Sequence, residues 1–180
     1  MRCASLAFLL LAACAPEKPL PILGQVPRFE LTDQKGRPFN RASLDGHIWI
    51  ADFIFTNCPG PCPRMSSKMH SMQTATPSDV LLVSFTIDPA RDTPEVLDAY
   101  SRNFAADPSR WSFLTGAPAE LNRLSMDTFH LGPIGGTLEH STRFVLVDNR
   151  GRIRATYVSG DPDTLTRISA DISRLGKEPV

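Results

Sequence analysis

Two stretches in the first half of the chain, residues 48–55 and 80–87, are almost continuously hydrophobic. Short runs of this kind, rich in Ile, Val and Phe, are typical of strands that are buried on both faces. Each run is followed by a segment whose apolar residues recur every three or four positions, which predicts a helix. The order strand, helix, strand, helix predicts a βαβ core with parallel strands.

Turn-forming residues divide the rest of the chain into shorter elements. A closing β-hairpin followed by a helix, placed after a βαβ core, is the pattern of an α/β thioredoxin-like fold. The early hairpin would be an N-terminal β-hairpin extension of that fold. The predicted elements are helices over 63–74, 93–104, 118–129 and 161–175, β-hairpins over 29–39 and 142–158, and a short strand over 111–114.

Two cysteines stand where the first buried strand gives way to a helix. Cys58 and Cys62 are separated by three residues. Proline biases the residue before it away from the α region, and this corner holds three prolines, Pro59, Pro61 and Pro63. Pro63 suits the first helical position, so Cys62 would be the N-cap, where the helix dipole favours a thiolate. We therefore expect a rigid corner with an acidic, reactive pair of thiols.

A close pair of thiols has several chemical uses. Thiolates are soft ligands for copper(I) and zinc, and two of them can also close into a disulfide. An ordinary stabilising disulfide is the plainest alternative. A ring of so few residues constrains the unfolded chain little, so stability is a poor reason for the pair.

The N-terminal stretch differs from the rest of the chain. Residues 1–13 combine a basic start with an apolar run too short to span a bilayer and then small residues, as in a secretory signal peptide. Leu11-Ala12-Ala13-Cys14 resembles a bacterial lipobox, which implies cleavage before Cys14 and a lipid anchor on the periplasmic face of a membrane. A soluble secreted protein cut nearby is the alternative. Residues 14–27 contain four prolines and are interpreted as a tether, leaving 28–176 as the folded domain.

Charge and cysteine count narrow the function further. The chain has 19 Lys and Arg residues against 19 Asp and Glu, with no basic block, so nucleic-acid binding has no support. Cys3 belongs to the leader and Cys14 would carry the lipid. Cys58 and Cys62 would then remain as thiols in an oxidising compartment, where we expect dithiol and disulfide to interconvert and the dithiol alone to take up a metal.

Three blocks of residues carry a resemblance to a known family. They are Thr56-Asn57-Cys58-Pro59-Gly60-Pro61-Cys62-Pro63, Thr86-Ile87-Asp88-Pro89-Ala90-Arg91-Asp92-Thr93-Pro94-Glu95, and Glu139-His140-Ser141 running into Phe144-Val145-Leu146-Val147-Asp148. Together they resemble the Sco/SenC copper chaperones over about residues 26–175. The resemblance implies a thioredoxin-like fold and one copper ion bound by two cysteines and a distant histidine, which are Cys58, Cys62 and His140 here. It also implies delivery of copper to the dinuclear centre of cytochrome c oxidase, with the oxidase's copper-binding subunit as partner.

Asp88 and Asp92 follow the second buried strand. The carboxyl ends of parallel strands meet at one edge of a sheet, so both are expected near the cysteine corner. They could orient His140 or receive a partner there, and turn or capping chemistry is the alternative. The remaining histidines are assigned structural or solvent-facing places, and a stripe of methionines is assigned to the core: His47, His70 and His130, and Met65, Met69 and Met72.

Two other classes of function stay open. One is an enzyme, a thiol-disulfide reductase that keeps the copper-ligand cysteines of the oxidase reduced, and the other is a copper or redox sensor. A thioredoxin-type oxidoreductase normally has two residues between its cysteines and a proline before the facing strand. Here three intervene and residues 139–142 contain no proline, which favours metal binding. Zinc would suit two thiolates and an imidazole too, and the resemblance favours copper. Other periplasmic copper chaperones or thiol reductants are further candidate partners.

Overall fold

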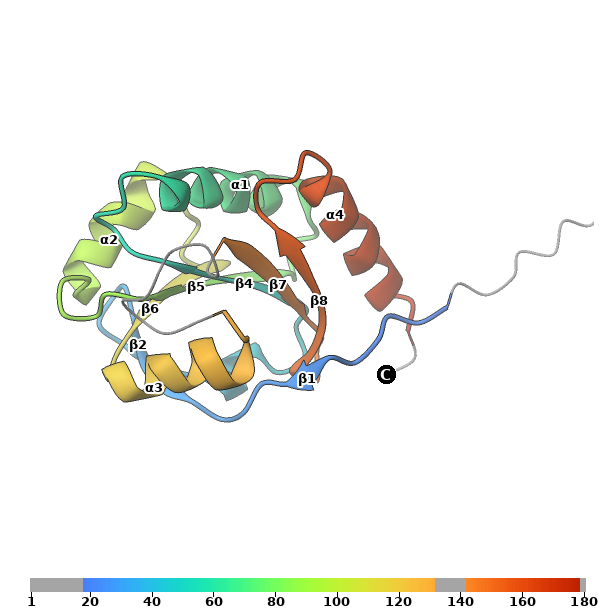
Figure 1. Cartoon of the computed structure of the whole chain (residues 1–180), viewed down its shortest axis with the longest axis horizontal. Helices are drawn as coiled ribbons and strands as arrows, with labels where there is room; N and C mark the ends of the chain where they lie inside the picture. The colour runs from blue at the N-terminus through green and yellow to red at the C-terminus, as the bar shows by residue number, and fades with distance from the viewer. Residues whose placement is uncertain (1–17, 132–141, 179–180) are drawn as a thin grey trace, which may run out of the picture.

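A computed structural model describes residues 18–131 and 142–178 (Figure 1). Its strands form an eight-stranded sheet in the order β1-β8-β7-β4-β5-β6-β2-β3. The strands are β1 Gly24–Gln25, β2 Glu30–Asp33, β3 Pro38–Asn40, β4 Trp49–Ile54, β5 Leu81–Thr86, β6 Trp111–Thr115, β7 Arg143–Val147 and β8 Arg152–Val158. The helices are the 3₁₀ turn η1 Arg41–Leu44, α1 Pro61–Ala75, α2 Pro94–Asn103, α3 Pro118–Asn122, which continues as the π-helix η2 Arg123–Thr128, and α4 Thr164–Leu175.

The centre of the sheet is the predicted βαβ core. β4 pairs in parallel with β5, and β5 pairs in parallel with β6. All six residues of β4 are buried, as expected for a strand covered on both faces. β7 runs antiparallel beside β4, with Trp49 opposite Val147 and Ala51 opposite Val145. The start of β7 therefore lies at the sheet edge where β4 ends.

Helices cover both faces of this sheet. Figure 1 shows α1, α2 and α4 on one side and α3 with η2 on the other. The side under α1 packs the predicted methionine stripe, Met65, Met69 and Met72, into the core. The opposite side is aromatic, since Phe53 stacks on Phe85 with ring centroids 5.0 Å apart. The assignment of the methionines to packing is thus confirmed.

Capping residues and turn glycines explain where several elements begin and end. Thr93 is the N-cap of α2, its hydroxyl accepting the Val96 N–H at 3.4 Å, as predicted from the Thr-Pro pair. The two β-hairpins turn at Gly36 and Gly151, both at φ +74°, a conformation that glycine adopts without strain. The first hairpin, β2 with β3, extends the sheet beyond β6 and confirms the N-terminal extension.

The third predicted helix changes its form after Asn122. The Phe129 N–H bonds the Leu124 carbonyl at 2.9 Å, five residues back, which is the π-helical pattern. Residues five apart point in different directions on an α-helix, whereas a wider turn brings them onto one face. Leu124 and Phe129 are consequently both buried against the sheet, as the sequence predicted.

The predicted tether is partly incorporated into the domain. Leu20 is buried, and β1 pairs with the start of β8, with Gly24 opposite Ile153. This pairing could not be predicted, because a two-residue strand has no periodicity to detect. Cys14 and the leader lie outside the described residues. In the described part of the chain no helix is long and apolar enough to cross a membrane.

Candidate metal centre

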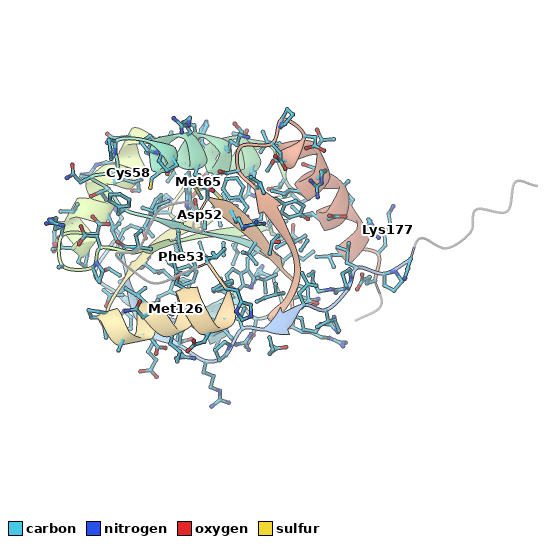
Figure 2. All side chains as sticks on the ribbon, in the orientation of Figure 1. Asp52, Phe53, Cys58, Met65, Met126 and Lys177 are labelled. Carbon is cyan, nitrogen blue, oxygen red and sulfur yellow. The ribbon has the colours of Figure 1, made fainter. Side chains whose placement is uncertain are left out.

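The cysteine corner joins the end of β4 to the start of α1. α1 begins at Pro61 with Gly60 as its N-cap, so Cys62 is the second residue of the helix and not its N-cap. The predicted boundary is wrong by two residues because Pro61 also suits the first turn of a helix. Figure 2 shows Cys58 at this corner, at the end of the molecule away from Lys177.

The two cysteines lie together as free thiols. Cys58 is 7% exposed and Cys62 is 3% exposed. The Cys62 backbone N–H donates to the Cys58 sulfur at 3.5 Å, which holds the first turn of the helix against that sulfur. Two thiols at such a turn are a soft donor pair, and this donor chemistry fits copper(I).

The expectation of an acidic Cys62 is wrong for the metal-free protein. Burial raises the pKa of the Cys62 thiol above its usual range, and its hydrogen bond with Cys58 raises it further. A hydrogen bond from the Phe55 backbone acts in the opposite direction but does not prevail. Removing Cys62 from water disfavours the charged thiolate, and this is the largest cause of the raised pKa. A metal must therefore displace a proton from Cys62.

Asp92 holds the strand that leads into the corner. Its carboxylate is 1% exposed and accepts hydrogen bonds from the Thr56 hydroxyl at 2.5 Å and the Thr56 N–H at 3.2 Å. It also accepts the Thr86 hydroxyl at 2.5 Å, from the end of β5. Asp92 thus connects the end of β5 to Thr56, which follows β4 and lies two residues before Cys58. This is a positioning role for the backbone of the corner.

Asp88 lies nearer the surface of the same loop. Its carboxylate pairs with Arg91 at 2.8 Å, and its carbonyl accepts the N–H groups of Arg91 and Asp92. These are turn interactions, which was the alternative expected for this residue.

His140 lies outside the described residues, so its ligand role stays a prediction. The prediction also required the strand after His140 to begin beside the end of β4, and the antiparallel pairing of β7 with β4 places the start of β7 there. Among the described residues, no three His, Cys, Asp or Glu side chains gather closely enough to hold a metal. Two of the three expected ligands, Cys58 and Cys62, are thus seen together.

The other histidines have places of their own. His47 Nδ1 hydrogen-bonds the Asp79 carbonyl at 3.0 Å, and His130 Nδ1 hydrogen-bonds the Met126 carbonyl at 3.1 Å. Both therefore stabilise local backbone, as expected. His70 was expected to face solvent, but it is half-buried on α1 and its Nδ1 has no hydrogen-bond partner in the described part of the chain.

A buried carboxyl that the sequence reasoning missed lies in the middle of β4. Asp52 is fully buried, and the Ser84 hydroxyl donates to its Oδ1 at 2.6 Å. The Trp111 indole N–H in turn donates to Ser84 at 3.0 Å, while Asp52 Oδ2 has no partner within the described residues. Burial raises the pKa of Asp52 to about 7. A lone acid inside the hydrophobic run 48–55 was the available signal.

The fold and the site define a class, a thioredoxin-like α/β domain with a dithiol at a strand-to-helix corner. The SCO1/SenC family profile matches residues 23–176. The chain belongs to the SCO1/SenC family.

Solved structures of that family are similar to this one. A SCO1/SenC family lipoprotein from Bacillus anthracis is 35% identical with a TM-score of 0.79, covering 87% of this chain and 98% of that one. BsSco, described as a Sco-family cytochrome c oxidase assembly protein with a disulfide switch, is 28% identical with a TM-score of 0.78, covering 90% and 100%. Copper-bound yeast Sco1 is 28% identical with a TM-score of 0.71, covering 89% and 96%.

Proposed function

We propose that this protein binds one copper ion through Cys58, Cys62 and His140 and delivers it to the dinuclear copper centre of cytochrome c oxidase. The observation that carries the proposal is the pair of free thiols at the corner between β4 and α1. Copper-bound yeast Sco1 and the oxidase-assembly role of BsSco support copper as the cargo and the oxidase's copper-binding subunit as recipient.

The geometry suits a metal that is held and then passed on. Cys58 and Cys62 are presented by a short loop and the first turn of a helix, so the two cysteines, both largely buried, lie at the same corner. Two thiolates and one imidazole leave a position for an incoming ligand, which permits exchange with a recipient's cysteines. Cys62 would release its proton as copper binds.

Copper loading of variants tests this site. In His140→Ala we expect copper(I) to remain bound by the two thiolates, because copper(I) accepts low coordination, and most copper(II) binding to be lost. Cys58→Ser should lose both oxidation states. Metal analysis and visible absorption report these outcomes, and His47→Ala and His130→Ala are matched controls. If His140→Ala binds both oxidation states like the unchanged protein, the ligand set is wrong.

Delivery needs its own measurement. When the copper-loaded protein is mixed with the reduced, copper-free domain of the oxidase subunit, the visible absorption of that domain's copper centre should appear as copper is transferred. If copper binds but is not transferred, the protein is a sensor or a store.

A second candidate is thiol-disulfide exchange, favoured by the hydrogen bond that places the Cys62 backbone against the Cys58 sulfur. We expect reversible disulfide formation and copper uptake by the dithiol alone. Thiol labelling before and after reductant, with copper added to each form, measures both. A disulfide form that took up copper equally well would contradict this expectation. Reduction of the oxidase cysteines without copper transfer would make the reductase function the better description.

The location is proposed on the sequence and on the B. anthracis relative, which is described as a lipoprotein. Cleavage before Cys14 and lipidation of that residue would hold the domain at the periplasmic face of the membrane. Cys14→Ser should move the protein from the membrane to the soluble fraction. An unchanged protein that is fully soluble, with another N-terminus, would contradict this.

A further inference from the structure

The N-terminal strap, defined here as residues 18–26, is fixed along one edge of the domain. The Leu23 N–H donates to the Ile153 carbonyl and the Val26 N–H to the Gly151 carbonyl, both at 2.8 Å. Leu20 is buried in the core cluster under α1. The strap is therefore part of the folded domain and not a free tether.

Arg154 fastens the beginning of the strap. Its guanidinium is 3% exposed and donates to the Leu20 carbonyl at 2.6 Å and the Pro21 carbonyl at 3.1 Å. The same group pairs with Asp148 and with Glu178, each at 2.8 Å. Releasing the strap would leave part of this buried charge network unpaired, which is costly. Arg174 also donates to the Lys18 carbonyl at 2.6 Å, so the attachment begins at the first described residue.

The strap and the cysteine corner lie at opposite ends of the strands: the strap lies at the end of the sheet where β4 begins, and the corner lies where β4 ends. The strap runs beside Ile153, which pairs with Val147, and Val147 pairs with Trp49 at the start of β4. The cysteines follow the other end of β4, a strand of six residues that spans about 17 Å. Figure 2 agrees, with Lys177 and Cys58 at opposite ends of the molecule.

The chain between the proposed lipid and the strap is short. From Cys14 to Lys18 there are 18 − 14 = 4 residue steps, which span at most about 14 Å. A tether that ran free to Arg28 would span about 50 Å. A domain of this size is about 40 Å across, so the short tether restricts its orientation and the long one would not.

We propose that the domain sits with the strap edge of its sheet against the lipid headgroups and with the cysteine corner facing away from the membrane. The inference rests on the lipid anchor in the proposed function and adds an interaction surface to it. The surface is the edge where β4 begins, and its partner is the bilayer. The corner then meets recipient domains that project into the periplasm.

Paramagnetic broadening tests the orientation. The mature lipidated protein is placed in nanodiscs that contain a gadolinium-chelate lipid, and amide signals are compared with and without gadolinium. Signals at the strap edge, from Gly46, Asn149 and Gly176, should broaden severalfold more than those of Thr56 and Ile87 beside the corner. Equal broadening, or stronger broadening at the corner, would overturn the proposal.

Insertions show whether tether length is the cause. About ten Gly and Ser residues inserted between Glu17 and Lys18 leave the strap intact and should make the broadening nearly even. The same insertion after Val180 is the control and should leave the unchanged protein's pattern. If the first insertion also keeps that pattern, tether length does not set the orientation and the proposal falls.

Two further measurements test the contacts of Arg154 that hold the strap and separate a failure of the orientation from a failure of copper binding. Glu178→Gln weakens the ion pair between Arg154 and Glu178, so the Leu23 and Val26 amides should exchange with solvent faster. Unchanged exchange would show that Arg154 and Glu178 do not hold the strap. Copper titration of the same nanodisc samples should give equal uptake in all of them. Loss of copper uptake with the oriented pattern intact would count against the copper function alone, whereas even broadening with normal uptake counts against the orientation alone.

Discussion

Replacing Asp52 by asparagine should stabilise the domain at pH 8 and have little or no stabilising effect at pH 5. Burial raises the pKa of Asp52 from an ordinary value of 3.8 to about 7 in the folded state. The folded protein therefore holds a proton that the unfolded chain has released, and stability falls as pH rises from about 4 to about 7. The full penalty is about 4 kcal/mol, because each pKa unit corresponds to about 1.4 kcal/mol.

The comparison of two pH values removes constant differences between the proteins. Asparagine carries no charge, and its oxygen can still accept the Ser84 hydroxyl, while its amide would take the place of the unpaired Oδ2. That unpaired amide costs about 1–3 kcal/mol at every pH. Between pH 5 and pH 8, the gain of Asp52→Asn over the unchanged protein should grow by about 2–3 kcal/mol.

Urea unfolding of the reduced, copper-free protein at both pH values measures this change. Asp79→Asn, which alters an exposed carboxylate, is the control and should show no comparable growth. If the difference in unfolding free energy between Asp52→Asn and the unchanged protein is the same at pH 5 and pH 8, the buried carboxyl is not titrating as argued. The carboxyl carbon shift of Asp52, followed by NMR, gives an independent titration.

Three further predictions concern the corner and the core. Because burial raises the pKa of the Cys62 thiol, copper(I) uptake must release its proton. Apparent affinity in a chelator competition should therefore rise at least about tenfold per pH unit between pH 6 and pH 8, and a flat profile would contradict this. Asp92→Asn places an amide against the donors of Thr56 and should lower the free energy of unfolding, measured thermally, by about 2–4 kcal/mol. Asp88→Asn removes one partner of an exposed ion pair and should lower it by less than about 1 kcal/mol. Equal losses would refute the distinction. Phe129→Ala should cost about 3–5 kcal/mol, since its ring packs among three other aromatics on the π-helical side, and a loss below about 1 kcal/mol would show that this contact is not important.

Most of the fold could be predicted because its signals are local. The runs over 48–55 and 80–87 became β4 and β5, and Thr93-Pro94 marked the start of α2. Each of these depends on residues within a few positions of one another. The π-helix could not be predicted, because its wider turn is selected by packing of Leu124 and Phe129 against a sheet formed elsewhere in the chain.

The site shows the same division between local and long-range effects. Cys58, Cys62 and the loop with Asp92 could be located from local motifs, whereas the pKa of Cys62 could not be predicted from its place at the start of a helix. Burial of Cys62 depends on a core cluster to which distant parts of the chain contribute, and it raises the pKa of the thiol. The strap was missed for a related reason, since its attachment depends on Arg154, more than a hundred residues away.

The corner's rigidity comes mainly from groups other than the sulfur atoms. Asp92 fixes Thr56 to the end of β5, and the ladder between β4 and β5 fixes the strand up to Ile54. Cys58 and Cys62 add the contact between the Cys62 N–H and the Cys58 sulfur, which does not by itself hold the fold together. The contacts of Asp92 and of the ladder between β4 and β5 do not depend on the chemical state of the sulfurs, and the proposed exchange of copper at Cys58 and Cys62 needs a backbone that is held in this way.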